Sequence, residues 1–438
     1  MTGAANSGML SGMNLCVTAS GRFLQWEDGT PFFWLGDTAW ELFHRLTLDE
    51  AKHYLDVRFE QGFTVVQAVL LAEFEGLTEP NREGHLPLHD LDPTRPNLHY
   101  FEHVDAVLEY AETLGLMVGL LPTWGDKVVK AWGAGPVIFN PENAYAYGKW
   151  LGLRYLHREN LIWINGGDRK PKTEEEIATF NKLGQGLRDA DPNHLIAFHP
   201  QGGCHSSDDY HYADWLDINQ IQSGHGARWI DNAAMVDKDY ALTPPKPTLD
   251  AEPNYENHAI NWKNSTSRFR DEDVRLSLWR SVFAGACGVT YGCQDVWQFF
   301  DPELHAAVAY ADTHWSEALQ FSGAWQVRHL RSLMEERGFT TGAPAQERVL
   351  SEEAGARCSV GEGYLLCYLP RGGEVTLLVE NLGFEIAAVS WFDPRTGIAV
   401  DDDEIDCAGE VTFSAPTEGR HNDWVLCVEA TEVPDDED

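Results

Sequence analysis

Short apolar runs alternate with helical patterns between residue 30 and about residue 295. Eight such runs occur, at residues 32–36, 63–71, 116–122, 161–165, 195–199, 217–222, 247–252 and 288–292. Buried parallel strands are short, nearly continuous apolar runs, and helices that cross between them follow a period of about 3.6 residues. Eight strand–helix units over about 260 residues predict an α/β fold, a (β/α)8 TIM barrel.

The stretches between the runs carry signals for the start and end of helices. We expect helices at residues 47–61, 101–114, 144–157, 173–190, 227–240 and 271–286, and a last one near 302–320. Thr47 or Asp49 could cap the first, and Thr173 with Glu176 forms a capping box for the fourth. After the second run comes a connection from residue 72 to 100 with four prolines, far longer than the usual few residues. We expect it to wall off one end of the barrel mouth, although it could instead fold outward.

The two ends of the chain have a different pattern. Residues 1–30 contain a hairpin-like stretch at 21–30 with an Asp-Gly turn. Beyond the barrel, alternating or β-branched segments at 364–369, 374–380, 387–392 and 424–429 are separated by turns at 372–373 and 395–397. The predicted domains are therefore an N-terminal hairpin segment (1–30), the barrel (31–322), an antiparallel β-sandwich (323–430) and a disordered acidic tail (431–438). A short apolar link near 320–326 predicts that the sandwich is fixed to the barrel.

Composition narrows the possible environment and partners. The formal net charge is -37, which argues against nucleic acid or anionic membranes as partners and leaves the oligomeric state open. Lysine is scarce among so many acids, so we expect adaptation to high salt, with an ordinary acidic cytosolic enzyme as the alternative. No apolar run is long enough to cross a bilayer, and no export signal is seen. The eight cysteines are scattered along the chain, so we expect free thiols. A cytoplasmic protein is expected.

In a barrel of this kind, function collects where strands end and βα loops begin. These positions are rich in amides, carboxylates, histidines and tryptophans, which suit the hydroxyls and C–H faces of sugars. The candidate substrate-binding residues are Asp37, Trp40, Gln67, Trp124, Asn165, His199, His205, Gln222, His225, Tyr255, Gln294 and Trp297. No His-x-His or His-Glu-x-x-His pattern accompanies the histidines, so neither a metal nor another cofactor is expected.

Asp168 and Glu252 are the acids at the ends of the fourth and seventh strands, which face each other across an eight-stranded barrel. Hydrolysis of a glycoside with retention needs two carboxyl groups about 5–5.5 Å apart. We therefore predict Asp168 as general acid/base, kept protonated by an apolar loop and by the charge of Glu252, and Glu252 as nucleophile. Asp168 could instead form a surface ion pair with the basic residues that follow it, and Asp250 is expected to be a deeper structural acid.

Several of these segments resemble one known family. The segments are 32–40 (FFWLGDTAW), 163–168 (WINGGD), 215–217 (WLD), 222–225 (QSGH), 252–256 (EPNYE) and 290–292 (TYG), and 391–397 (WFDPRTG) resembles the small β domain that follows the barrel. Together they are similar to the apiosidase-like barrels, which include glycoside hydrolase family 140. The resemblance implies an acid at Asp168, a nucleophile at Glu252 and removal of apiose or another pentose-like sugar. The long connection at 72–100, if it walls off the mouth, predicts that this sugar is a terminal one. An arabinofuranosidase, a glycosidase of another specificity, and a non-catalytic carbohydrate-binding barrel remain alternatives.

Overall fold

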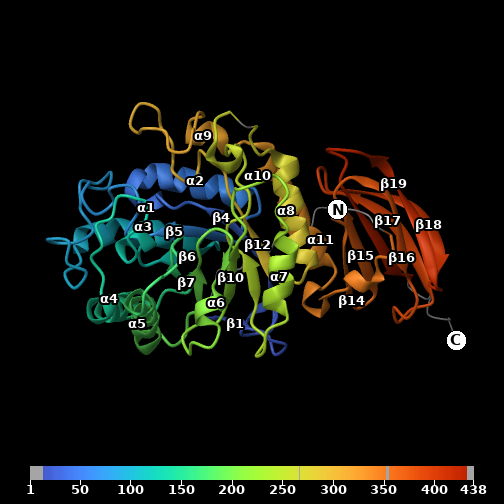
Figure 1. The fold of residues 1–438 in the computed structure, drawn as a ribbon, viewed down its shortest axis with the longest axis horizontal. Helices are drawn as coiled ribbons and strands as arrows, with labels where there is room; N and C mark the ends of the chain where they lie inside the picture. The colour runs from blue at the N-terminus through green and yellow to red at the C-terminus, as the bar shows by residue number, and fades with distance from the viewer. Residues whose placement is uncertain (1–12, 266, 352–354, 432–438) are drawn as a thin grey trace.

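A computed structural model describes residues 13–265, 267–351 and 355–431, and its core is the predicted barrel (Figure 1). Its eight parallel strands are β4 (Trp34–Thr38), β5 (Val65–Val69), β6 (Met117–Leu121), β7 (Leu161–Gly166), β8 (Ile196–His199), β10 (Asn219–Gln222), β11 (Thr248–Asp250) and β12 (Gly288–Tyr291). They form one curled sheet in the order β8-β7-β6-β5-β4-β12-β11-β10, with β9 (Cys204–His205) antiparallel at the edge. A parallel bridge between Ala197 and Ile218 joins its two ends. Every strand overlaps its predicted run.

The main helices lie around the sheet, and two of them begin at caps that the sequence indicates. They are α2 (Leu48–Glu60), α3 (Leu98–Thr113), α4 (Pro141–Tyr155), α5 (Glu174–Ala190), α7 (Asn232–Tyr240) and α8 (Asp271–Phe283), with short α1 (Leu42–Arg45) and α6 (Ser207–Tyr210). The capping box predicted at Thr173 is present, and Thr47, one of the two caps considered for the first helix, also forms one. Helix α4 starts earlier than expected because Asn140 caps it and Pro141 occupies its first turn.

The helix expected near residues 302–320 does not form. Only α9 (Trp315–Ala318) is helical there, and α10 (Ser322–Gln326) and α11 (Arg328–Glu336) follow it. The side chain of Gln298 accepts from the N–H of Val308 and donates to its carbonyl oxygen, and the carboxylate of Asp295 accepts from two further backbone N–H groups. Side chains thus satisfy backbone groups that a helix would otherwise pair. The segment is an irregular loop.

The expected hairpin before the barrel is part of a three-stranded antiparallel sheet. Its strands are β1 (Leu15–Val17), β2 (Leu24–Trp26) and β3 (Pro31–Phe32). The turn between β2 and β3 contains the predicted Asp28-Gly29 pair, and Gly29 has a φ of 89°. A left-handed residue in a tight turn is the usual reason for glycine at such a position.

The C-terminal region is an antiparallel β structure. A six-stranded sheet has the order β13-β14-β15-β20-β17-β18, and β16 pairs with β19. The strands are β13 (Ala343–Pro344), β14 (Arg357–Gly361), β15 (Tyr364–Leu369), β16 (Gly372–Leu378), β17 (Ile386–Asp393), β18 (Ile398–Asp406), β19 (Glu410–Glu418) and β20 (Trp424–Ala430). The four predicted strands are confirmed as β15, β16, β17 and β20, whereas the sequence pattern does not predict β13, β14, β18 or β19. Gly372 and Gly373 lie at an irregularity inside β16 and do not form the expected turn. Residues 432–438 of the expected tail lie outside the described residues.

This β domain packs directly on the barrel through α8, which lies between the two in Figure 1. The buried guanidinium of Arg275 donates to both carboxylate oxygens of Asp423, each at 2.9 Å. Trp279 stacks on Tyr368 with 5.7 Å between ring centroids. Paired charges and stacked aromatic rings thus hold the β domain against the barrel, and the packing agrees with what the short apolar link predicts.

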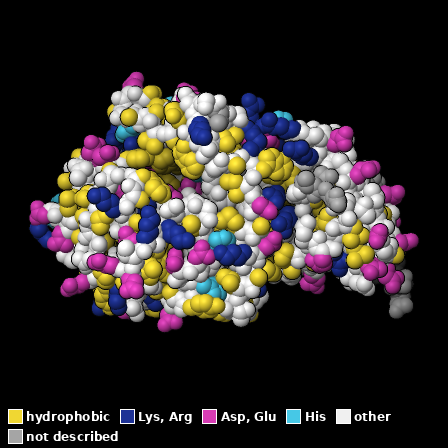
Figure 2. All heavy atoms as spheres, in the orientation of Figure 1, with side chains coloured by type: hydrophobic (Ala, Val, Ile, Leu, Met, Phe, Trp, Pro, Cys, Tyr) yellow, Lys and Arg dark blue, Asp and Glu magenta, His cyan; other side chains and the backbone are white. Residues whose placement is uncertain are grey.

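The surface agrees with the acidic composition. Figure 2 shows Asp and Glu side chains spread over both the barrel and the β domain on the face in view. All eight cysteines carry free thiols, as predicted. Within the described chain, no helix is both long and apolar enough to cross a membrane.

Candidate active site

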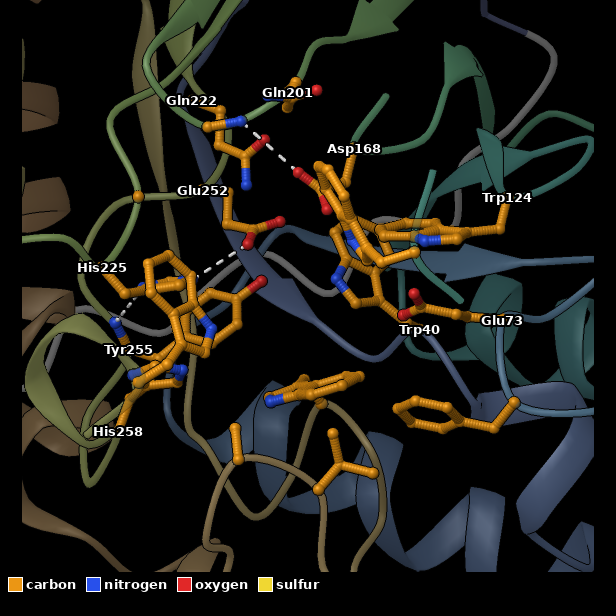
Figure 3. A pocket seen from close by; sticks show the side chains of 18 of the residues that line it. Trp40, Glu73, Trp124, Asp168, Gln201, Gln222, His225, Glu252, Tyr255 and His258 are labelled. Carbon is orange, nitrogen blue, oxygen red and sulfur yellow. Dashed lines mark hydrogen bonds and ion pairs between the residues drawn. The ribbon is translucent and has the colours of Figure 1, made fainter. Parts of the chain in front are cut away.

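The loops at the carboxyl ends of the barrel strands surround a cavity of about 700 Å³ (Figure 3). Its walls combine aromatic rings, amides, histidines and carboxyl groups. The lining residues are Trp40, Glu73, Phe74, Trp124, Trp132, Asp168, Gln201, Gly202, Gln222, Gly224, His225, Glu252, Tyr255, His258, Trp262, Trp297 and residues 307–310. The cavity has the size of a small-molecule site and lies where barrel enzymes bind substrate.

Asp168 reaches this cavity from an unusual backbone turn at the end of β7. Gly166, Gly167 and Asp168 have φ angles of 96°, 111° and 50° in succession. A Cβ on Gly167 would lie 2.6 Å from the backbone nitrogen of Gly125, so the position has no room for a side chain. A non-glycine residue in the left-handed region costs about 1 kcal/mol or more and persists where surrounding structure enforces it. The two glycines therefore allow the turn that presents the carboxyl group.

The environment of Asp168 favours its protonated form. Burial, and after it the negative charge of Glu252, raises the pKa of Asp168 to about 6. Arg169 opposes this rise by donating from Nη1 to Oδ2 at 3.0 Å, and the N–H of Gly202 is 3.4 Å from Oδ1. The result is a carboxyl group that can hold a proton near neutral pH and release it.

Glu252 lies just beyond β11 and is held in the ionised form. His199 donates from Nε2 to one carboxylate oxygen and His225 donates from Nε2 to the other, each at 3.0 Å. Burial alone would raise the pKa of Glu252, but the hydrogen bonds from the two histidines outweigh it and lower the pKa well below its usual range. The Nδ1 atom of His225 lies 3.4 Å from the N–H of Tyr255, which fits a neutral ring that carries its proton on Nε2. The pKa values of Glu252 and Asp168 are therefore shifted in opposite directions within one cavity.

The charged residues next to Asp168 show whether it forms a surface ion pair or belongs to the cavity. Arg169 does pair with it, but Arg169 is completely buried and also donates from Nη2 to Glu73 at 3.2 Å. Burial raises the pKa of Glu73 to about 7. Arg169 thus lies buried behind the two carboxyl groups that line the cavity, and the ion pair is not a surface contact. Asp250 is a deep structural acid, as expected, because it accepts from Ser223 and Asn232.

Six of the expected substrate-binding residues line the cavity, and a seventh supports it. The six are Trp40, Trp124, Gln222, His225, Tyr255 and Trp297. The seventh is His199, which holds Glu252 and packs with its ring centroid 5.2 Å from that of Trp40.

Five other expected residues do not line the cavity, and hydrogen bonds inside the fold explain their polarity. Asp37 accepts from Tyr54 and Arg58, Gln67 donates to the carbonyl of Ala251, and Asn165 donates to the carbonyl of Phe180. His205 pairs with Asp239, and Gln294 contacts Trp297 and the carbonyl of Val308. Strand ends therefore contain structural polar residues as well as residues of the site.

The loops supply residues that strand ends could not reveal. Trp132, after β6, and Trp262, after β11, are 50% and 51% exposed. Tryptophans in loops rich in glycine and polar residues are the signal that could have identified them. His258 stacks on His225 at 4.5 Å, and burial lowers its pKa to about 2. It is therefore neutral.

The long connection after β5 does not form the wall predicted for it. It contributes Glu73 and Phe74, but none of residues 75–97, all of them described, lines the cavity. The exposed lining residues come instead from other loops, among them Trp132 after β6, Trp262 after β11 and Tyr310 after β12. No lining residue comes from the β domain.

The three candidate histidines contact carboxylates at two separate places. His199 and His225 contact Glu252, whereas His205 contacts Asp239. Over the described residues, no group of three or more His, Cys, Asp or Glu side chains is arranged to hold a metal ion.

Comparison with known proteins gives the family. The sequence pattern of the family described as "Apiosidase-like, catalytic domain" matches residues 18–341, and that of "Putative collagen-binding domain of a collagenase" matches residues 344–429. A solved structure named only as a glycoside hydrolase is 30% identical, with a TM-score of 0.87 over 96% of this chain and 97% of the other. A glycoside hydrolase family 5 structure from Bacteroides vulgatus is also 30% identical, with a TM-score of 0.87 over 95% and 93%. No curated protein matches. With the family match spanning most of the chain and a site built around two carboxyl groups, the protein belongs to the apiosidase-like family of glycoside hydrolases.

Proposed function

We propose that the protein is a retaining glycoside hydrolase that removes a terminal sugar, with Asp168 as general acid/base and Glu252 as nucleophile. One observation carries this proposal: two carboxyl groups face one cavity, and their pKa values are shifted in opposite directions. Environments that separate the pKa values of two carboxyl groups are what assign acid and nucleophile in glycosidases.

In the first step, Asp168 transfers its proton to the glycosidic oxygen while a carboxylate oxygen of Glu252 attacks the anomeric carbon. The bond to the leaving group breaks, and a glycosyl ester of Glu252 forms. In the second step, Asp168 takes a proton from water, the water oxygen attacks the anomeric carbon, and Glu252 leaves as a carboxylate. His199 and His225 orient Glu252 throughout, and their N–H groups stabilise its negative charge.

The family name supports apiose or a related pentose as the sugar. A cavity of about 700 Å³ with loops on several sides supports release of a single terminal unit over cleavage within a long chain. An arabinofuranoside is the main rival substrate, and the same assay separates the two. A carbohydrate-binding barrel without catalysis would bind sugars and hydrolyse none.

A screen of 4-nitrophenyl glycosides, including apiosides and arabinofuranosides, tests the activity. We expect the Asp168→Asn and Glu252→Gln proteins to lose about 10³-fold or more in kcat. Glu79→Gln is the matched control, because Glu79 is an exposed carboxylate outside the cavity.

Azide distinguishes the two roles. In the Glu252→Ala protein azide should attack the anomeric carbon directly and give a glycosyl azide of inverted configuration. In the Asp168→Ala protein it should attack the glycosyl ester and give an azide of retained configuration. A wild-type product of inverted configuration, observed by NMR, would refute the retaining mechanism.

A further inference from the structure

We propose that Gln222 recognises the hydroxyl group on carbon 2 of the sugar, the carbon next to the anomeric centre, and that only sugars with this hydroxyl free are hydrolysed efficiently. This inference rests on the proposed function and names a structural feature that the substrate must carry at the sugar to be released.

The fold directs the Gln222 side chain into the barrel. Ile221 packs in an apolar cluster with Ala233 and Val236 of α7, so it faces the helices. Successive side chains of a strand alternate between its two faces, and Gln222 therefore faces the barrel interior. The carbonyl oxygen of Gln222 accepts from the N–H of Gly203 at 2.7 Å, which fixes the end of β10. The amide is thus presented from a strand that is held at its carboxyl end.

Gln222 lies between the two proposed catalytic groups (Figure 3). On one side, a Cβ on Gly202 would lie 3.9 Å from Nε2 of Gln222, and the N–H of Gly202 is 3.4 Å from Oδ1 of Asp168. On the other side, Glu252 follows the neighbouring strand β11, and its carbonyl oxygen accepts from the N–H of Gly224 at 2.9 Å. The acid and the nucleophile act on the two atoms of the glycosidic bond, so a group between them lies next to the anomeric carbon. Carbon 2 carries the hydroxyl nearest to that centre.

Gln222 brings a buried amide oxygen to the cavity. The residue is 3% exposed, and its Oε1 has no hydrogen-bond partner among the described residues. A buried polar atom without a partner is unfavourable, and a sugar hydroxyl can donate a hydrogen bond to this oxygen and satisfy it. As the anomeric carbon gains positive charge, the hydroxyl on carbon 2 becomes a stronger donor. The hydrogen bond is therefore strongest in the transition state.

The other polar groups near the reacting atoms are already engaged. Gln201, the other amide among the described lining residues, accepts from the N–H of Lys170 at 3.3 Å. Gly167, directly before Asp168, has no side chain and no room for one. The two histidines beside the nucleophile donate to its carboxylate. Gln222 is therefore the amide that is placed to bind the hydroxyl on carbon 2.

A sugar with and without this hydroxyl tests the assignment. The two substrates are the 4-nitrophenyl glycoside that the screen identifies and its 2-deoxy counterpart. For the wild-type enzyme we expect kcat/KM to fall by about 100-fold or more when the hydroxyl is absent, because a site built to bind a hydroxyl rejects an analogue without it. The 2-deoxy glycoside is chemically the more reactive of the two, so a slower enzymatic reaction reflects lost recognition.

Gln222→Ala and Gln222→Met remove the amide, and methionine keeps the length of the side chain. Both variants should lose about 100-fold in kcat/KM with the parent glycoside and change by less than about threefold with the 2-deoxy glycoside. The two losses are then not additive, because both changes remove the same hydrogen bond. Both variants should unfold at the same urea concentration as the wild type, since the amide oxygen has no partner to lose within the described fold.

Two other glutamines serve as controls. Gln201→Ala removes an amide of the same cavity that is bound to a loop, so it should change kcat/KM for both substrates by the same factor. Gln185 is exposed on α5 outside the cavity, so Gln185→Ala should change neither value.

Equal losses with both substrates in the Gln222 variants, or no loss with either, would overturn the assignment. So would a wild-type enzyme that hydrolyses the 2-deoxy glycoside as fast as the parent. Each of these results requires an active enzyme. They therefore differ from failure of the proposed function, in which no glycoside is hydrolysed and this inference falls with it.

Discussion

Replacing Asp168 by asparagine should inactivate the enzyme and stabilise its fold at neutral pH. Burial and the charge of Glu252 raise the pKa of Asp168 from 3.8 to about 6. A group whose pKa is higher in the folded than in the unfolded state stabilises the fold, and this stabilisation is complete at pH values below the unfolded-state pKa of 3.8. That contribution is lost as the pH rises through about 6, because the ionised carboxylate is then less stable in the folded protein than in the unfolded chain.

The size of the effect follows from the two pKa values. A difference of about two units corresponds to about 3 kcal/mol at 1.36 kcal/mol per unit. Asparagine has the shape of the protonated acid and never ionises, so it avoids this cost. We expect the Asp168→Asn protein to be more stable than the wild type by about 2–3 kcal/mol at pH 8 and nearly equal to it at pH 4.

Urea denaturation followed by tryptophan fluorescence at pH 4, 6 and 8 measures this difference. The exposed-residue control, Glu79→Gln, should stay within about 0.5 kcal/mol of the wild type at all three values. An Asp168→Asn protein that is less stable than the wild type at pH 8 would refute the reasoning. So would a difference that does not change with pH, because only a titrating group gives one that does.

Further predictions concern the support of the nucleophile, the glycine turn, the domain interface and the surface charge. His199→Ala removes one of the two donors to Glu252, so the pKa of Glu252 should rise and the acidic limb of the pH profile of kcat/KM should move to higher pH; an unmoved limb would contradict this role. Gly167→Ala should lower the free energy of unfolding by about 3 kcal/mol or more, or abolish activity, because its Cβ would lie 2.6 Å from the backbone nitrogen of Gly125. A stable, fully active variant would show that the turn can relax. Arg275→Met should lower the stability of the interface by about 3–5 kcal/mol, because it leaves the Asp423 carboxylate buried without its cation; limited proteolysis should then release the barrel more readily. Finally, the melting temperature should rise from dilute to molar salt if the charge of -37 reflects adaptation to salt, and a flat or falling curve would reject that hypothesis.

The sequence by itself determines the barrel and the two acids. Apolar runs of strand length, separated by capped amphipathic segments, can bury their surface only in a few ways, and eight repeats select one of them. Asp168 and Glu252 could be placed at the same end of the barrel because parallel strands bring their carboxyl ends to the same edge. That rule needs only the position of each strand, which the local pattern provides.

The tertiary structure decided which polar residues belong to the site. At the strand ends, Gln222 reaches the cavity whereas Asn165 and Gln67 turn to carbonyl groups of the fold. An amide side chain can either line the cavity or form hydrogen bonds inside the fold. Which of the two it does depends on neighbours that are distant in sequence. Local pattern holds no information about those neighbours.

The loops differ most from what the sequence indicated. Residues 302–320 carry a helical pattern, but buried side chains such as Gln298 and Asp295 bind their backbone groups and keep the segment irregular. The rim tryptophans, Trp132 and Trp262, come from loops of different strands and meet around one cavity only after the barrel closes. A strand is defined by local periodicity, whereas the course of a loop depends on long-range contacts; the sequence therefore determined the scaffold and its acids, and the tertiary structure decided the cavity around them.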